Sequence, residues 1–154
     1  MLAGLLALGL PGSAARAAAP GVVVHALQPI AYEDARAALL DAMVDEGLAP
    51  PGINPFGEML ARTAPDLGHR ADFFEHAEIF SFCSARISAR LVTEDRHNIA
   101  LCPLTIALYT LPAKPQTVFL SYRKPAIAST GGRLAHALLR RLVNRTRENG
   151  GLPR

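Results

Sequence analysis

The sequence predicts a single α+β domain of two layers, in which helices pack on a mainly antiparallel sheet of about four or five strands. Two apolar segments, 104–111 and 117–123, are joined by a short proline-containing connection, which favours an antiparallel hairpin. Two further segments, 32–46 and 133–148, repeat apolar residues at helical spacing. With 154 residues, 50% of them hydrophobic, the chain is long enough for one compact core and too short for a second independent domain.

The first nineteen residues have the composition of a processing segment. An apolar run from Leu2 to Leu10 is interrupted by Pro11 and Gly12, and Ala17 to Ala19 fit the small-residue rule for signal peptidase. The run is too short to cross a bilayer as a helix. We therefore expect cleavage after Ala19, a periplasmic or secreted protein, and no stable membrane insertion after the leader is removed. The alternative is an alanine-rich N-terminal helix, because the segment lacks the basic residues that usually begin a signal peptide.

The elements that follow are predicted from β-branched, helical and proline patterns. Residues 21–27 form a β-branched run of strand length, and residues 32–46 have an apolar stripe with two acidic residues in the first turn, as expected of a helix. Three prolines between residues 48 and 56 exclude a central strand, which leaves an edge segment or a loop. Residues 56–67 have the spacing of a short helix.

The densest apolar pattern lies between residues 74 and 109, so we expect the rest of the chain to be organised around this stretch. Residues 77–83 alternate as a strand, with Phe80 and Phe82 on one face. A helix is expected over residues 86–93 after the capping residue Ser84. Residues 99–101 are then expected to return in an extended conformation.

The C-terminal third completes the predicted fold. The hairpin of 104–111 and 117–123 is followed by a helix over residues 133–148, whose apolar stripe should cover the sheet and whose arginines lie off that stripe. Residues 149–154 are expected to fray. The predicted organisation is thus a leader over 1–19, one domain over 20–148 and a short tail.

Charge excludes one class of partner. The formal net charge is +3, and the basic residues are scattered until the last helix. Nucleic-acid binding needs a concentrated basic surface. We therefore expect no nucleic-acid partner.

The order of motifs is similar to that of a known family. A strand ending in a cysteine (FSFCSA), a short helix (RISARL), a polar turn (TEDRHNIAL), the triplet CPL and the strands LTIALYTL and TVFLSYRKP resemble the family called domain of unknown function 302 (DUF302), over about Val22 to Pro125. The resemblance implies a small α+β domain, dimeric in some relatives, with no agreed activity. In the family pattern the second cysteine follows the proline, whereas here Cys102 precedes Pro103, so a role of that thiol in relatives does not carry over.

The two cysteines, Cys83 and Cys102, admit three interpretations. In an oxidising compartment they are expected to pair, and a disulfide closing a loop of about 18 residues would contribute about 3 kcal/mol in the chain-entropy model. They are alternatively two buried, inert thiols. A third interpretation makes Cys83 redox-active, because the dipole of the following helix, with His76 and Arg86 nearby, would stabilise its thiolate.

Metal or haem ligation remains an alternative. The ligand-type residues of the central stretch are His76, Cys83, His97 and Cys102, and thiolate with imidazole would suit copper or zinc. None of them has the spacing of a metal motif, and the chain has no C-x-x-C-H sequence for covalent haem. We therefore expect no cofactor, with metal and haem left open.

A ligand cleft between sheet and helices is the other candidate site. The sequence offers six candidates for its lining, namely His76, Ser84, Arg86, Tyr109, Tyr122 and Arg123. Arginine and tyrosine side chains of this kind suit a small anionic ligand. An ordinary amphipathic strand pair is the simpler explanation of the two tyrosines. No serine stands in a G-x-S-x-G motif, so no catalytic residue is assigned.

These observations favour an exported, non-enzymatic binding or accessory domain of the cell envelope. We expect it to self-associate as a homodimer and to bind a small molecule. The competing interpretation is a thiol-redox or metal- or haem-handling envelope protein that uses Cys83, Cys102 and a nearby histidine.

Overall fold

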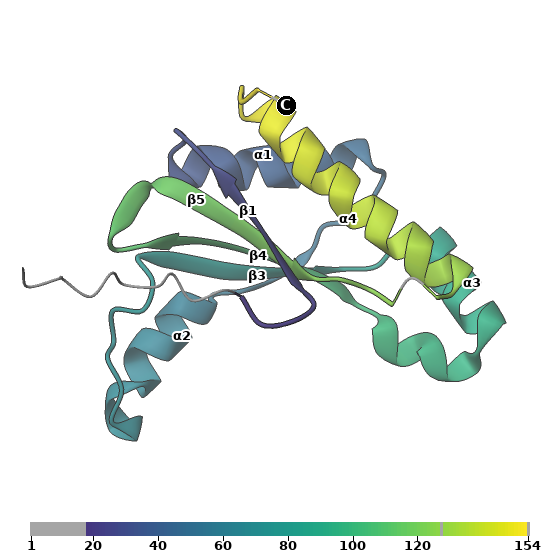
Figure 1. The fold of residues 1–154 in the computed structure, drawn as a ribbon, viewed down its shortest axis with the longest axis horizontal. Helices are drawn as coiled ribbons and strands as arrows, with labels where there is room; N and C mark the ends of the chain where they lie inside the picture. Colours follow the sequence, from purple (N-terminus) through teal and green to yellow (C-terminus); the bar gives the residue numbers. More distant parts are fainter. Residues whose placement is uncertain (1–17, 127, 154) are drawn as a thin grey trace, which may run out of the picture.

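The protein is described by a computed structural model that covers residues 18–126 and 128–153 (Figure 1). The predicted leader falls almost entirely on residues 1–17, outside the described residues. The strands are β1 (Val22–Leu27), β2 (Gly52–Asn54), β3 (His76–Phe82), β4 (Leu104–Leu111) and β5 (Lys114–Arg123). The helices are α1 (Tyr32–Asp45), α2 (Phe56–Thr63), α3 (Ala85–Glu94) and α4 (Thr130–Asn149), with two 3-10 turns, η1 (Pro65–Leu67) and η2 (Arg96–Leu101).

The five strands form one antiparallel sheet in the order β1-β5-β4-β3-β2. Helices α1 and α4 lie together on one face of the sheet, and α2 lies on the other side (Figure 1). The predicted two-layer α+β class is therefore confirmed. The short strand β2 pairs only with β3 and lies at the edge of the sheet. This agrees with the edge segment that the neighbouring prolines predict.

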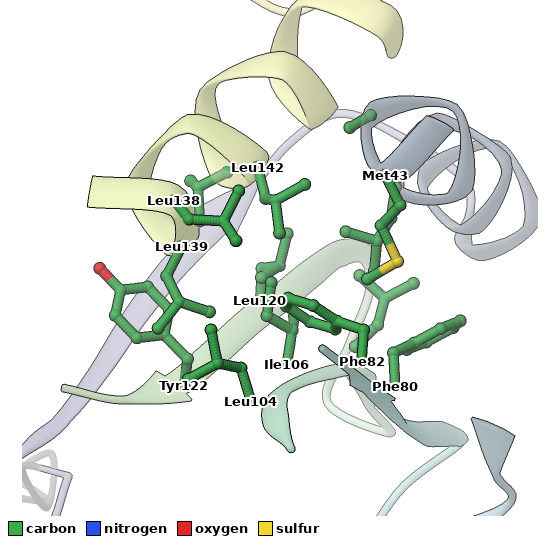
Figure 2. Close-up of a cluster of buried hydrophobic side chains, with 14 of the residues drawn as sticks. Met43, Phe80, Phe82, Leu104, Ile106, Leu120, Tyr122, Leu138, Leu139 and Leu142 are labelled. Atoms are coloured by element: carbon green, nitrogen blue, oxygen red, sulfur yellow. The ribbon is translucent and has the colours of Figure 1, made fainter. Parts of the chain in front are cut away.

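The core lies between the sheet and the pair α1 and α4. Alternation along the strands turns every second side chain towards these helices, including Phe80, Ile106 and Leu120, which are fully buried (Figure 2). Leu139 and Leu142 descend from α4 onto them. The face opposite this core carries a second, smaller set of aromatic contacts.

Helix α4 buries most of its predicted apolar stripe. The one exposed member of the stripe lines a cleft. Ala135, Leu138, Leu139, Leu142 and Val143 are all buried. Leu134 has the helical spacing of this stripe, four residues before Leu138, but it is 37% exposed. It lies one turn before Leu138, where α4 passes α3 and leaves an open depression.

Two predicted segments take another conformation. Residues 99–101 were expected to be extended, but they belong to the 3-10 turn η2, because the Asp95 side chain caps this turn by accepting a hydrogen bond of 2.8 Å from the His97 N–H. The predicted connection 112–116 is also shorter than expected. Strand β5 begins at Lys114, opposite Leu111, and the register then shifts between Thr110 and Leu111.

The segment after α4 packs against the domain. Gly151 has φ +70°, and the Leu152 N–H donates to the Arg147 carbonyl at 2.8 Å, which folds Leu152 back against the core. This turn lies within the region that the sequence treats as a frayed tail. Among the described residues, no helix is both long and apolar enough to span a membrane.

Candidate functional site

Three of the predicted site residues, Cys83, Ser84 and Arg86, meet in one cleft. The chain from β3 into α3 forms one wall, the segment after α1 forms another, and α4 closes the third side. The cleft has a volume of about 680 Å³, within the usual range for small-molecule sites. Its lining consists of Glu46, Gly47, Leu48, Ala49, Cys83, Ser84, Ala85, Arg86, Ile87, Leu134, Leu138 and Arg141.

The cleft combines an apolar floor with two cationic groups. Leu48, Ile87 and Leu138 supply buried or half-buried apolar surface, and the partly exposed Leu134 extends it towards solvent. Arg86 is exposed, and within the described part of the chain its guanidinium makes no hydrogen bond or ion pair. An apolar surface beside an unpaired guanidinium is suited to a ligand that has both an apolar part and a negative charge.

The second cationic group, Arg141, is held by a paired carboxylate. Glu46 accepts from Arg141 Nε at 3.0 Å and from Arg145 Nε at 2.8 Å, so that two arginines of α4 converge on one acid that follows α1. Burial works to raise the pKa of Glu46, but the hydrogen bonds and charges of the two arginines outweigh it and hold that pKa below its usual value. Glu46 is therefore ionised and fixes Arg141 at the cleft wall.

The two thiols lie next to each other, and Cys83 lines the β3 end of the cleft. Cys83 is exposed, whereas Cys102 is half-buried and packs against the core. Burial, the charge of the Cys102 sulfur and a hydrogen bond with it raise the pKa of Cys83. The pKa expected for Cys83 from the helix dipole was lower than usual, and this expectation is wrong. Burial and the neighbouring thiol both favour the protonated form, and the helix begins only at Ala85.

The predicted metal candidates are not brought together. His76 lies on β3 and His97 lies in η2, while only Cys83 and Cys102 adjoin each other. The described residues contain no group of three or more histidine, cysteine, aspartate or glutamate side chains arranged to hold a metal ion.

His76 belongs to a separate polar cluster that the sequence analysis missed. Its ring stacks on Tyr32 with centroids 4.6 Å apart, and the Tyr32 hydroxyl donates to Glu78 Oε2 at 2.8 Å. Arg36 Nε donates to the same oxygen at 2.7 Å. Burial, followed by the hydrogen bond to Glu78, raises the pKa of Tyr32 well above its usual range. The sequence contains one indication of this cluster: His76 and Glu78 are two residues apart on a strand and therefore lie on the same face.

The remaining candidates are dispersed. Tyr122 is 4% exposed in the core, where its ring centroid is 6.0 Å from that of His25. Tyr109 is on the opposite face of the sheet, and its ring stacks on Phe119 at 5.4 Å. Arg123 lines a different and smaller pocket of about 240 Å³ beneath the start of α4. The six predicted cleft residues therefore do not form one site.

The fold has a counterpart among solved structures. The crystal structure of an uncharacterized conserved DUF302 protein from Bacillus stearothermophilus matches it with a TM-score of 0.61 and 17% sequence identity, over 82% of this chain and 96% of that chain. No family model matches the sequence, and a search of curated proteins finds no match. At this identity the likeness establishes the fold and not an activity. The DUF302-like fold implied by the sequence motifs is thus confirmed.

Proposed function

We propose that this chain is an exported, non-catalytic domain that binds a small amphipathic anion in the cleft between α1, α3 and α4. The observation that carries the proposal is the unpaired Arg86 guanidinium beside the apolar surface of Leu134 and Leu138. The negative group of the ligand binds Arg86, and its apolar part covers the two leucines.

The charge balance of the cleft favours an anion. Its lining has two guanidiniums, those of Arg86 and Arg141, and one carboxylate, that of Glu46, which is already paired. A larger and more open depression of about 830 Å³ lies beside the start of α1, but Asp34 and Asp41 line it and would repel an anion. The α1–α3–α4 cleft is therefore the better candidate for a negatively charged ligand.

The chemistry of the lining favours binding over catalysis. The raised pKa of Cys83 leaves only a small fraction of this thiol as the thiolate at neutral pH, so the cleft holds no activated nucleophile for catalysis. Among the described residues that line the cleft, the one carboxylate is engaged by two arginines and no histidine is present to act as a base.

Export is compatible with the observed start of the domain. Strand β1 begins at Val22, and Ala19 contributes one backbone hydrogen bond of 3.0 Å, from the Val22 N–H to its carbonyl. Cleavage after Ala19 would keep this residue out of the mature chain and leave β1 intact. Sequencing the N-terminus of the mature protein from the cell envelope tests this part of the proposal, and a retained Met1 would contradict it.

Binding is tested with octyl phosphate by isothermal titration calorimetry. Replacing Arg86 by glutamine removes a charge-assisted hydrogen bond, so the affinity should fall about tenfold or more. Inorganic phosphate and octanol, which each lack one half of the probe, should bind more weakly than octyl phosphate.

The matched control is Arg96→Gln. Arg96 is an exposed arginine of η2 that lies outside the cleft lining, so this substitution changes the net charge equally and should leave the affinity unchanged. An equal loss in both variants would indicate a general charge effect. No loss in R86Q, or no binding by the wild type, would contradict the proposal.

A further inference from the structure

We propose that Cys83 and Cys102 are a reversible disulfide-forming pair, in which Cys83 reacts first with an external disulfide and Cys102 then closes the intramolecular bond. The partner is a small-molecule or protein disulfide, which acts as the oxidant. This proposal is independent of the ligand proposed for the cleft.

The sheet register brings the two cysteines together. The antiparallel ladder of β3 and β4 ends with Phe82 opposite Leu104. Cys83 directly follows Phe82, and Cys102 lies two residues before Leu104. Helix α3 and turn η2 take up most of the 18 residues between the cysteines, so this segment leaves the sheet and returns to it at one place. The two sulfurs interact as this register requires, because the charge of the Cys102 sulfur and a hydrogen bond with it raise the pKa of Cys83.

The surroundings of the two sulfurs differ, and the difference sets the order of reaction. Cys83 is exposed and lines the cleft, so a disulfide in solution reaches its sulfur. Cys102 is half-buried, packs against the core, and has its sulfur 3.3 Å from the Ser88 Oγ of α3. An oxidant therefore meets Cys83 first, while Cys102 is held behind it.

The exchange uses two successive substitutions at sulfur. The Cys83 thiolate attacks one sulfur of the oxidant, whose S–S bond breaks, and the departing thiolate takes up the proton that Cys83 has lost. The Cys102 thiolate then attacks the Cys83 sulfur of the mixed disulfide, forms the Cys83–Cys102 bond and expels the second thiolate, which takes up the proton lost by Cys102. The two cysteines lose two electrons, and the oxidant is reduced to two thiols.

The disulfide would join the two ends of the segment that contains α3 and η2. Before oxidation, this segment is attached through the buried side chains of Ile87 and Leu91 and through Glu94, which accepts from the Gly131 N–H at 3.0 Å. A covalent link restricts the unfolded chain, so oxidation should raise the urea midpoint, and dithiothreitol should reverse the rise.

The experiment oxidises the reduced full-length chain with glutathione disulfide. Samples are quenched with acid, alkylated with N-ethylmaleimide under denaturing conditions and weighed by mass spectrometry. We expect the doubly alkylated species to be replaced by an unalkylated one that has lost two hydrogens, with its cysteines linked in one monomeric chain. A wild-type product with glutathione on both cysteines, or a linkage between two chains, would overturn the proposal.

Two single substitutions test the order of attack. Cys102→Ser should accumulate a mixed disulfide at Cys83, because the resolving thiol is absent. Cys83→Ser should react with glutathione disulfide more slowly, on the order of tenfold, because Cys102 is half-buried. Circular dichroism verifies that both variants are folded. Equal rates at the two positions in folded variants would contradict the assigned order, and failure of the native wild type to react would contradict the pair itself.

Discussion

At the scale of single residues, the half-buried His25 makes the stability of the fold depend on pH. It lies on β1 with its side chain towards the helices, 6.0 Å from Tyr122 between ring centroids. Within the described structure its Nε2 is buried without a hydrogen-bond partner. Burial, followed by the charge of Arg147, lowers the pKa of His25. The folded protein therefore favours the neutral imidazole.

This environment predicts a loss of stability in mild acid. The unfolded His25 has a pKa of about 6.5, and the folded pKa is lower, so the unfolded state binds more protons as the pH falls below about 6.5. The free energy of unfolding should decrease over this window and level off below the folded pKa. Burial also lowers the pKa of His136, which acts in the same direction.

Urea denaturation between neutral pH and pH of about 5 measures the effect. His25→Gln should reduce the pH dependence, whereas His97→Gln, in the exposed η2 turn, should leave it unchanged. The same pH dependence in H25Q and in the wild type would assign the effect to another group.

At the scale of elements, the first residues of α4 lie very close to α3 and to the backbone that precedes α4. The Ser129 hydroxyl caps this helix by accepting from the Gly132 N–H at 3.0 Å, and Glu94 at the end of α3 accepts from the Gly131 N–H. A carboxylate is unfavourable at the end of its own helix, yet here it interacts with the positive end of the next one. A Cβ on Gly132 would collide with the Ala126 carbonyl oxygen, so this helix start requires glycine.

The two glycines predict a graded response to substitution. Gly132→Ala should destabilise the protein by about 1–3 kcal/mol, because the colliding atom belongs to the backbone. Gly131→Ala should cost less, because its Cβ would meet the side chain of Leu91, at 2.6 Å, which can rotate. Urea midpoints of the two variants compare them, and an equal or reversed order would contradict the role of the Ala126 carbonyl.

At the scale of the whole molecule, helices cover the two faces of the sheet to different extents. Helices α1 and α4 cover one face (Figure 1). On the other, α2 packs against β3, with Gly57 close to Ala77, whereas β1 leaves Val22 and Val24 exposed at 41% and 40%. Self-association, which the sequence predicted, stays a prediction, and this open face is where we expect a second copy to bind.

A pair of valines tests this expectation by analytical ultracentrifugation. If two copies join through the open face, Val24→Lys should shift the protein towards the monomer, because it places charges in the interface. Val44→Lys, on the exposed side of α1 at 72% exposure, is the matched control and should not. A wild type that is monomeric at all concentrations would exclude self-association, and a dimer that survives V24K would place the contact elsewhere.

The candidate site was only partly predictable. Cys83, Ser84 and Arg86 are close in sequence, so their proximity followed from a strand that leads into a helix. Leu48 and Arg141 complete the cleft from elements far away along the chain, and no local pattern connects them. The cluster of Glu78 with Arg36, which lie 42 residues apart, was missed for the same reason.

The sequence by itself determined the main helices and strands and most of their buried faces, because spacing of two or of 3.6 residues is a local property. It also determined that Cys83 stands between a strand and a helix. It did not determine the turn η2 or the start of β5. The tertiary structure alone decided the order β1-β5-β4-β3-β2, the exposure of Leu134 and the cleft formed by three helices and their loops. These features depend on the energies of contacts between segments that are far apart in the sequence, and a local residue pattern does not specify those contacts.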